Sequence, residues 1–362
     1  MLERNLSKTG PLMAILAIGG FVLAGCAGPS ESAVEESPAP EQEAQTEAES
    51  LVIGYSPKFL KDDFQVLLEG AVQNEASSRG WTVNTSDANG DVAKQVADIE
   101  NLIAGGAQAL VVVPVDGAGV VPGIEAANAA GIPVFSIDDG PAGGDVFATV
   151  RADNINAGVQ GAEEMVNRLQ NDSCWPSECV VLELQGGLQT VNGQHRSQGF
   201  YDTISELAPE VDVIQRPTEW TAEMAADATQ NVLTQTPDLD GIFMASELMA
   251  AAVNARLAEA GRGAAVGDPE SVIRVAIDGT PAGLQLIREG ALDATVSQPL
   301  GAYASKVMEL IELAISGGAL EDGPQNDGQV VTSAAGKEYQ LFPTLVTSSN
   351  VDDQTLWGNL AG

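Results

Sequence analysis

Polar side chains follow several apolar runs of this sequence, at the point where each run ends. The runs have the length of buried strands, and the side chains after them are carboxylates, amides and a hydroxyl. In open α/β sheets, ligands bind outside the carboxyl ends of the strands. Acceptors and donors of this kind suit a ligand that is dense in hydroxyl groups. The strand-end residues are Asp138, Asp139, Gln185, Ser246, Glu247, Asp278 and Gln298.

Two other roles, helix capping and catalysis, also use side chains of these types. Helix capping explains any single position as well as binding does, for example Asp278 before Thr280, but it does not explain the set. Paired carboxylates such as Asp138 and Asp278 are also what a glycosidase uses. His195 is the only histidine, and no nucleophile with a partnered base accompanies it. We therefore expect binding, with no catalytic residue, no metal and no cofactor.

The elements that carry these residues alternate between short apolar runs and longer amphipathic segments, which is typical of βαβ units. Residues 109–113 and 133–137 are continuously apolar, as strands buried on both faces must be. The pattern restarts after Asp153 and has too many strands for one sheet, so we predict an α/β fold of two doubly wound lobes. The predicted strands are 51–55, 81–85, 109–113, 133–137, 180–184, 211–215, 241–245, 273–277 and 294–297. The predicted helices are 64–79, 92–105, 155–169, 196–207, 222–233, 248–260, 282–288 and 302–316.

The N-terminus has the layout of a bacterial lipoprotein leader. Arg4 and Lys8 precede an apolar run over 12–23, and Leu-Ala-Gly-Cys ends at Cys26. The run is too short to span a bilayer comfortably, so a transmembrane anchor is the weaker alternative. We predict a leader over 1–25, lipidation of Cys26 and a disordered acidic tether over 26–50. The protein is then extracytoplasmic and anchored to the cell membrane.

Composition sets further limits. The net charge of −35 argues against a nucleic-acid partner, which needs clustered Lys and Arg. The two other cysteines, Cys174 and Cys179, lie close together in sequence, and in an oxidising compartment a short-loop disulfide between them is the expected pairing.

Three segments give the chain a resemblance to a known family. They are Val-Ala-Ile-Asp-Gly-Thr-Pro over 275–281, Thr-Val-Ser-Gln-Pro over 295–299 and Gly-Gln-His-Arg-Ser-Gln-Gly-Phe over 193–200. The chain from 51 to about 351 resembles the ribose-type branch of type 1 periplasmic binding proteins, which serve bacterial sugar transporters. The resemblance implies two Rossmann-like lobes with parallel sheets joined by a multi-strand hinge. It also implies a monomer that delivers its ligand to an ABC permease with its ATPase.

The resemblance also implies lobe boundaries and site residues. The first lobe is 51–153, completed by about 299–335; the second is 154–298, completed by about 336–350; 351–362 is a C-terminal tail. Asp138 and Asp278 match the carboxylates that bind sugar hydroxyls from each lobe, and Gln298 matches the hinge glutamine. Trp220 matches a stacking aromatic, with a core tryptophan as the alternative, and Phe64 matches an aromatic of the first lobe.

Departures from the family pattern concern the ligand. Asp139 and Gln194 stand where ribose binders carry arginine, Ser246 replaces an asparagine, and Asp63 replaces an aromatic. The loss of two guanidinium donors and the gain of a carboxylate favour a ligand that donates more hydrogen bonds than it accepts, such as a polyol or another pentose or hexose. Lys58 or Arg196 could replace a lost donor.

Asn192 and Arg196 belong to a glycine-rich stretch, Gly186-Gly187 to Gly193, that opens a helix. A phosphate cradle is the rival interpretation, but neither nucleotide-binding glycine motif is present. Arg196 either contacts the ligand or turn, or makes a surface salt bridge. We expect the lobes to close on a small polyhydroxy ligand. The alternative is a sensory protein that presents the ligand to a membrane receptor; a transcription regulator would need a basic helix-turn-helix.

Overall fold

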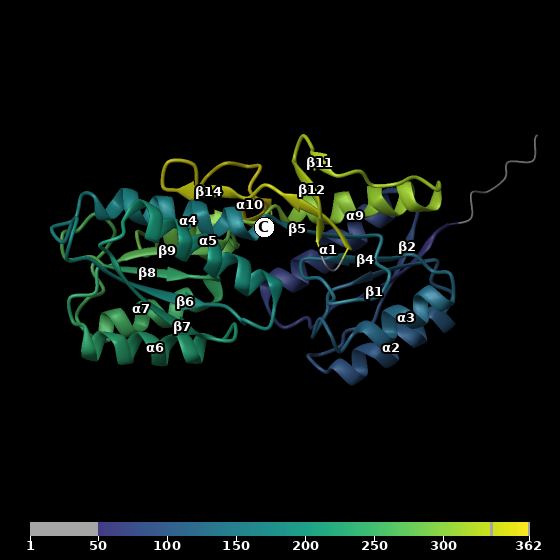
Figure 1. Ribbon diagram of the computed structural model, residues 1–362, viewed down its shortest axis with the longest axis horizontal. Helices are drawn as coiled ribbons and strands as arrows, with labels where there is room; N and C mark the ends of the chain where they lie inside the picture. Colours follow the sequence, from purple (N-terminus) through teal and green to yellow (C-terminus); the bar gives the residue numbers. More distant parts are fainter. Residues whose placement is uncertain (1–49, 334–335, 361–362) are drawn as a thin grey trace, which may run out of the picture. The chain divides into compact units, whose positions relative to one another are not determined.

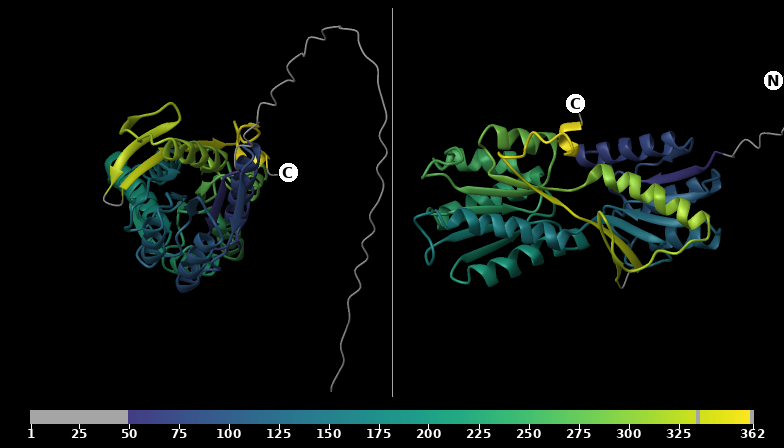
Figure 2. Two further views of the ribbon diagram at one scale, coloured as in Figure 1. Left: turned by 90° about the vertical axis from the view of Figure 1, so that its right-hand side faces the viewer. Right: turned by 90° about the horizontal axis from the view of Figure 1, so that it is seen from above.

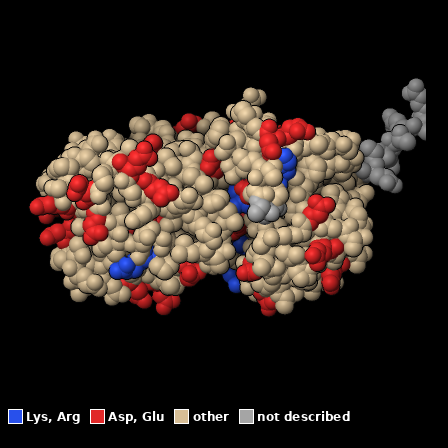
Figure 3. Space-filling view, viewed as in Figure 1, with Lys and Arg blue, Asp and Glu red and all other residues tan. Residues whose placement is uncertain are grey.

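The computed structural model describes residues 50–333 and 336–360 (Figure 1). The predicted leader, the predicted lipidation site Cys26 and all but the last residue of the predicted tether lie outside the described residues. In the described part of the chain, no helix is both long enough and apolar enough to cross a bilayer. Figure 3 shows Asp and Glu side chains scattered over the face viewed, with few Lys or Arg among them.

The first lobe is built on a mixed sheet in which most strands run parallel. Helices α1 and α9 cover one face and α2 and α3 the other, and apolar side chains fill both layers (Figure 1). The strand order is β11 (Gly323–Pro324), β12 (Gly328–Ser333), β13 (Gly336–Leu341), β5 (Ala148–Ala152), β4 (Val134–Ile137), β3 (Ala109–Val112), β1 (Val52–Ser56) and β2 (Thr82–Thr85). The helices are α1 (Asp63–Ser78), α2 (Val92–Ala104), α3 (Val121–Ala129) and α9 (Leu300–Ile315).

The second lobe repeats this design around a smaller sheet. Helices α4 and α5 cover one face and α6, α7 and α8 the other. The strand order is β14 (Thr344–Thr347), β10 (Ala294–Ser297), β9 (Ile273–Asp278), β8 (Gly241–Met244), β6 (Val180–Gln185) and β7 (Asp212–Pro217). The helices are α4 (Asn154–Leu169), α5 (Val191–Leu207), α6 (Ala222–Gln235), α7 (Ala250–Glu259) and α8 (Pro281–Arg288), with a 3₁₀ turn η1 (Glu247–Met249) and the short helix α10 (Trp357–Leu360) near the chain end.

Local sequence signals explain why the helices begin where they do. Side chains of Asp62, Asp91, Asp153, Thr190 and Thr280 accept a hydrogen bond from the first turn of the helix that follows each of them. The central strands β3 and β4 are buried along their whole length, as their apolar composition predicts.

The predicted fold class, two α/β lobes with largely parallel sheets, is confirmed. The sheets are mixed, because β14 runs antiparallel to β10, and β12 runs antiparallel to both β13 and β11. The chain passes between the two sheets after β5, after β10 and after β13, so the lobes are joined by several segments (Figure 2).

Two predicted boundaries need correction. Residues 336–341 were assigned to the second lobe, but they form β13, which pairs in parallel with β5 of the first sheet. Only β14 joins the second sheet. The predicted tail over 351–362 contains Trp357, which is buried in the core of the first lobe, whereas Val351 and Leu356 pack into the core of the second. Short apolar runs do not identify the sheet they join, because strand partners are set by contacts distant in sequence.

Candidate functional site

A cavity of about 400 Å³ lies between the carboxyl ends of the strands of both sheets. All of the predicted ligand-binding residues except Gln194 line it. They are Phe64, Asp138, Asp139, Asn192, Arg196, Trp220, Ser246, Asp278 and Gln298. Further lining residues that the sequence did not single out as ligand-binding include Lys58, Phe59, Asp62, Gln65, Gln189, Thr190, Glu219 and Leu248.

Asp138 organises the first-lobe wall. It follows β4, is buried, and has a φ of 68°, which is uncommon for a residue other than glycine. Its Oδ2 accepts from Gln65 Nε2 at 2.9 Å and from Lys58 Nζ at 3.3 Å. Asn192 of the second lobe donates through Nδ2 to Asp138 Oδ1 at 3.2 Å and to its main-chain oxygen at 3.1 Å. Asp138 is therefore also a point of contact between the two lobes.

Asp278, the last residue of β9, has the matching place in the second lobe. It is buried and has a φ of 147°. Its Oδ1 accepts from Gln298 Nε2 at 2.7 Å and Arg196 Nη1 at 3.2 Å, and its Oδ2 from Ser246 Oγ at 2.6 Å. Strained backbone of this kind persists where the surroundings over-determine it, typically at ligand sites. Burial raises the pKa of Asp278, and the neighbouring charge of Arg196 opposes that rise.

Helix capping does not explain Asp278. The cap of α8 is Thr280, whose hydroxyl accepts from Gly283 N at 2.9 Å. Ser246 does cap η1, through a bond from Leu248 N at 3.2 Å, and also donates to Asp278. Capping and site formation are thus combined in one serine side chain.

Arg196 is a buried side chain, so the surface salt-bridge interpretation is wrong. Only 3 % of the residue is exposed. Its Nε donates to Asn154 Oδ1 and its Nη1 to Ala245 O, both at 2.7 Å, besides the bond to Asp278. The guanidinium carbon lies 5.5 Å from the centre of the Trp220 ring. Arg196 therefore ties β8, β9, α4 and the cavity aromatic together.

Trp220 lies between the cavity and the core of the second lobe. It lines the cavity and is half-buried against the second-lobe core. The ring lies against the backbone of Gly186 and Gly187, where a Cβ on either glycine would collide with it. Gly193 packs in the same way against the backbone of Gly187. These glycines therefore allow close packing of the turn and of the Trp220 ring.

Gln298 is held in one orientation by a residue that the sequence did not single out. Tyr303 OH donates to Gln298 Oε1 at 2.8 Å and accepts from Ala152 N at 2.6 Å. The amide nitrogen of Gln298 is therefore the group that meets Asp278. Ala152 and Gln298 both lie where the chain passes between the sheets, so the tyrosine joins the cavity wall to these connecting segments.

Gln194 was assigned to the site, but the structure places it outside the cavity. The predicted helix start at 196 is wrong, because α5 begins at Val191 after the cap Thr190. On a helix, positions four apart share a face. Asn192 and Arg196 therefore face the cavity together, while Gln194 is exposed and donates through Nε2 to Leu188 O at 2.8 Å. His195 is half-buried and does not line the cavity.

Glu247 and Gln185 lie behind the cavity wall. Glu247 accepts from Gly279 N at 2.8 Å and Thr280 N at 2.7 Å, and from the hydroxyls of Thr280 and Thr295. Burial, with the nearby charge of Asp278, raises the pKa of Glu247 to about 7. Gln185 donates to Ser197 Oγ at 2.7 Å. These strand-end residues fix the turns that carry the site.

Lys58 lines the cavity from the segment after β1. Burial acts to lower the pKa of Lys58, but Asp138, Asp139 and Asp62 outweigh it, so the pKa is raised and the ammonium stays charged. Glu219 and Asp62 add carboxylates to the lining, and Arg196 adds the other cation. The cavity therefore has five carboxylates and two cations in its walls.

Aromatic rings connect the cavity to the end of the chain. Phe64 meets Trp357 edge-on at 5.9 Å between ring centres and Tyr303 at 6.5 Å. Trp357 Nε1 donates to Asp278 O at 3.2 Å. Trp357 thus contacts the first lobe through its ring and the second through its nitrogen. No local pattern marked this residue, because its partners are distant in sequence.

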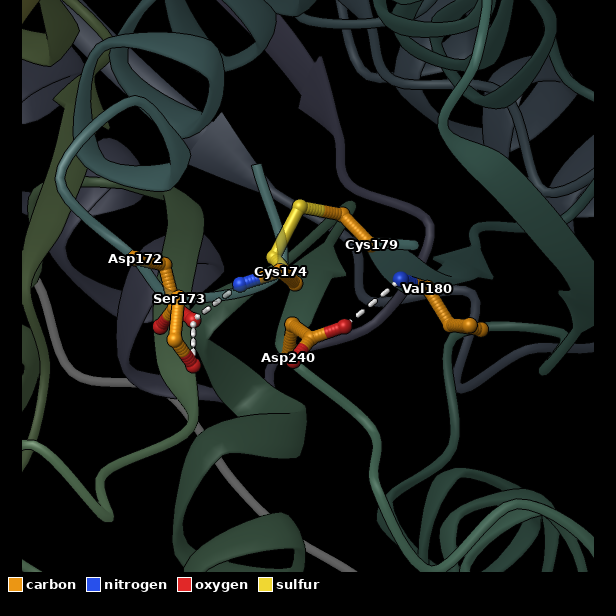
Figure 4. Close-up of a disulfide and its surroundings, with 6 residues drawn as sticks. All are labelled: Asp172, Ser173, Cys174, Cys179, Val180 and Asp240. Carbon is orange, nitrogen blue, oxygen red and sulfur yellow. Dashed lines mark hydrogen bonds between the residues drawn. A yellow bond between two sulfur atoms is a disulfide. The ribbon is translucent and has the colours of Figure 1, made fainter. Parts of the chain in front are cut away.

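The predicted disulfide is present in the structure, between Cys174 and Cys179 (Figure 4). It precedes β6, and Asp240 lies beside it, accepting from Val180 N at 2.7 Å. Among the described residues, Cys174, Cys179 and Asp240 are the only group with the spacing of a metal site. Because the sulfurs are bonded to each other, they do not offer thiolates to a metal.

Comparison with known proteins gives concordant results. Residues 53–319 match a family model described as a periplasmic binding protein domain. The ribose import binding protein RbsB of Salmonella typhimurium is 27 % identical over 259 residues, covering 71 % of this chain and 82 % of the relative. An ABC transporter solute-binding protein from Mycobacterium smegmatis, solved with bound glycerol, is 26 % identical with a TM-score of 0.71, covering 84 % of this chain and 97 % of that one. A Bacillus halodurans C-125 solute-binding protein with bound myo-inositol is 25 % identical with a TM-score of 0.70 and the same two coverages, 84 % and 97 %.

The family match spans more than half of the chain, and the two solved structures share its architecture. The chain therefore belongs to the periplasmic binding protein family, and its resemblance to the type 1 branch is confirmed.

Proposed function

We propose that this member of the periplasmic binding protein family binds a monosaccharide or polyol in the cavity between its lobes and delivers it to an ABC permease. The observation that carries the proposal is that two buried aspartates with a positive φ, Asp138 from one lobe and Asp278 from the other, line one cavity. No chemical step is proposed for the cavity.

The cavity walls suit hydroxyl groups, which need both an acceptor and a donor. Asp138 and Asp278 supply acceptors, and Lys58, Arg196 and Gln298 supply donors. Trp220 and Phe64 add apolar surface for the C–H faces of a sugar ring or polyol chain. The glycerol and myo-inositol bound to the two solved relatives support a polyol in particular.

Binding is coupled to closure of the lobes. Each lobe holds part of the site, and the chain passes between the sheets at several points that can act as a hinge. A ligand that contacts both walls favours the closed form, because only that form supplies both sets of contacts. The hydrogen bonds from Asn192 of the second lobe to Asp138 of the first also hold the two lobes together.

A thermal-shift screen across pentoses, hexoses, polyols and amino acids tests the proposed ligand class. A ligand at 100 times its Kd stabilises the protein by about 2.7 kcal/mol, which raises the melting temperature measurably. Asp278→Ala should remove the shift, and the exposed Glu210→Ala should keep it. Shifts with amino acids and none with any polyhydroxy compound would refute the assignment.

The membrane role requires separate tests. We propose that Cys26 is lipidated, so Cys26→Ala should move the protein from the membrane fraction to the soluble fraction. Sensing is the alternative to transport, and both use the same closure. Loss of ligand uptake in cells that lack this chain supports transport, whereas normal uptake with loss of a transcriptional response supports sensing.

A further inference from the structure

The buried charges of the cavity do not balance. Asp138, Asp139 and Asp278 are 4 %, 5 % and 7 % exposed, and each lines the cavity. Arg196 pairs with Asp278 at 3.2 Å, and Lys58 pairs with Asp138 at 3.3 Å. Three buried carboxylates therefore face two cations, and the unmatched one is Asp139.

The backbone of Asp139 is held by a hydrogen bond, whereas its carboxylate has few partners. Its main-chain oxygen accepts from Ser136 Oγ at 2.7 Å. Within the described residues, the one hydrogen bond to its carboxylate comes from Gly140 N to Oδ1 at 3.1 Å, and no cation lies within ion-pair distance of it. The nearby Arg151 is paired with Glu338 at 3.5 Å. Burial raises the pKa of Asp139, and the charges of Lys58 and Arg151, neither of them within ion-pair distance, only partly oppose that rise.

A second unmatched acceptor lies on the same wall. Gln65 is 1 % exposed and lines the cavity, and its Nε2 is bound to Asp138. This bond fixes the amide so that Oε1 is the other atom, and that oxygen is buried without a hydrogen-bond partner in the described structure. In the described structure, Asp139 Oδ2 is thus the acceptor that this wall offers to a ligand, and Gln65 Oε1 is an unpaired acceptor buried next to it in the same wall.

We propose that the preferred ligand is an amino polyol or amino sugar whose protonated amine binds Asp139. The proposal rests on the proposed function, since it names the ligand class of the same cavity. An ammonium supplies up to three N–H donors and one positive charge, which brings the buried groups to neutrality. A neutral hydroxyl supplies one donor and no charge, and its bond to a carboxylate is weaker than a bond between two ions.

The same charges disfavour the opposite ligand class. A sugar acid would add a negative charge to walls that already hold five carboxylates and two cations. Like charges brought together in a partly desolvated site repel each other strongly. Sugar acids are therefore expected to bind worst among compounds of equal size.

Calorimetric titration with matched compounds tests the proposal. Glucitol and glucamine differ by one hydroxyl replaced by an amine, and N-acetylglucamine keeps the nitrogen without the charge. Glucamine should bind at least about tenfold more tightly than either. Glucose, glucosamine and N-acetylglucosamine form a second set that allows for a ligand that must be a ring.

The variant Asp139→Asn tests whether the charge of this residue causes the preference for an amine. It removes the charge at nearly constant size, so the ratio of the amine affinity to the affinity for the neutral compound should fall to about one. Glu219→Gln, which removes an exposed carboxylate of the same cavity, should retain the preference. If Asp139→Asn does not fold, the wild-type comparison of amine with neutral compound decides alone.

The outcomes separate this proposal from the one it rests on. Neutral compounds that bind as tightly as their amines, or more tightly, overturn the amine proposal and leave the proposed function standing. An amine preference that survives Asp139→Asn overturns the role of Asp139. No binding by any polyhydroxy compound, charged or neutral, overturns both proposals.

Discussion

Replacing Asp278 by asparagine tests whether one buried charge organises the second-lobe half of the cavity. The carboxylate accepts from Gln298, Arg196 and Ser246, on both of its oxygens. Asparagine has nearly the same size but offers one acceptor oxygen. Its NH₂ group must face donors on one side or the other, and Arg196 loses its charged partner.

The expected cost follows from burial. Removal of one member of a buried ion pair costs about 3–5 kcal/mol, because the other charge stays in a poorly solvated place. Arg196 is 3 % exposed, so this range applies. Since asparagine keeps one acceptor, we expect the low end, about 3 kcal/mol. Loss of a charge-assisted bond to the ligand costs about 1.5–3 kcal/mol, which weakens binding about 10- to 150-fold.

Urea unfolding without ligand measures the stability term, and calorimetric titration with the best polyhydroxy ligand measures the binding term. Asp293→Asn is the matched control. Asp293 is buried and binds Arg168 at 2.8 Å, and it does not line the cavity. The Asp293→Asn variant should have a lower free energy of unfolding and the same affinity for the ligand as the wild type. Unfolding of Asp278→Asn within about 1 kcal/mol of wild type, or unchanged ligand affinity, would refute the reasoning.

Three further predictions concern packing, orientation and pH. Gly186→Ala should weaken ligand binding at least about tenfold, because its Cβ collides with Trp220, whereas Gly70→Ala, in open space on α1, should not. Tyr303→Phe should cost about 1–3 kcal/mol in urea unfolding, since Ala152 N loses its acceptor; an equal midpoint contradicts this. Burial raises the pKa of Glu183 to about 7, so the folded state binds a proton that the unfolded state has released, and stability falls as pH rises from about 4.5 to 7. Glu183→Gln should flatten that fall by about 1.4 kcal/mol per pH unit, measured by urea unfolding at pH 5, 6 and 7; an unchanged slope contradicts the assignment.

The sequence predicted the parts of the site that follow from the sheet itself. Buried strands have continuous apolar sequences, so the first polar residue after each run marks the carboxyl edge of the sheet, where the cavity forms. Asp138, Ser246, Asp278 and Gln298 were located in this way and line it, whereas Gln185 and Glu247, selected by the same rule, lie behind its wall. The fold class followed from the same alternation of strands and helices.

What the sequence did not predict depends on contacts between distant segments or on the exact start of a helix. Gln194 was assigned to the site from the family pattern, but α5 begins at Val191 and places Gln194 on its exposed face. Lys58 was considered only as a replacement donor, since nothing local shows that it reaches Asp138 across 80 residues of chain. Trp357 and β13 have partners that no local pattern identifies.

The way β13 completes the first sheet also affects the order of events during synthesis. The first-lobe core needs side chains from α9 and β13, including Leu300, Tyr303 and Leu341. A ribosome makes these residues only near the end of the chain, after the whole second lobe. The N-terminal lobe therefore cannot complete its core while synthesis continues, although domains usually fold in the order in which they emerge. A chain that crosses a membrane before folding benefits from this delay, because its first segments stay unfolded until its last ones arrive.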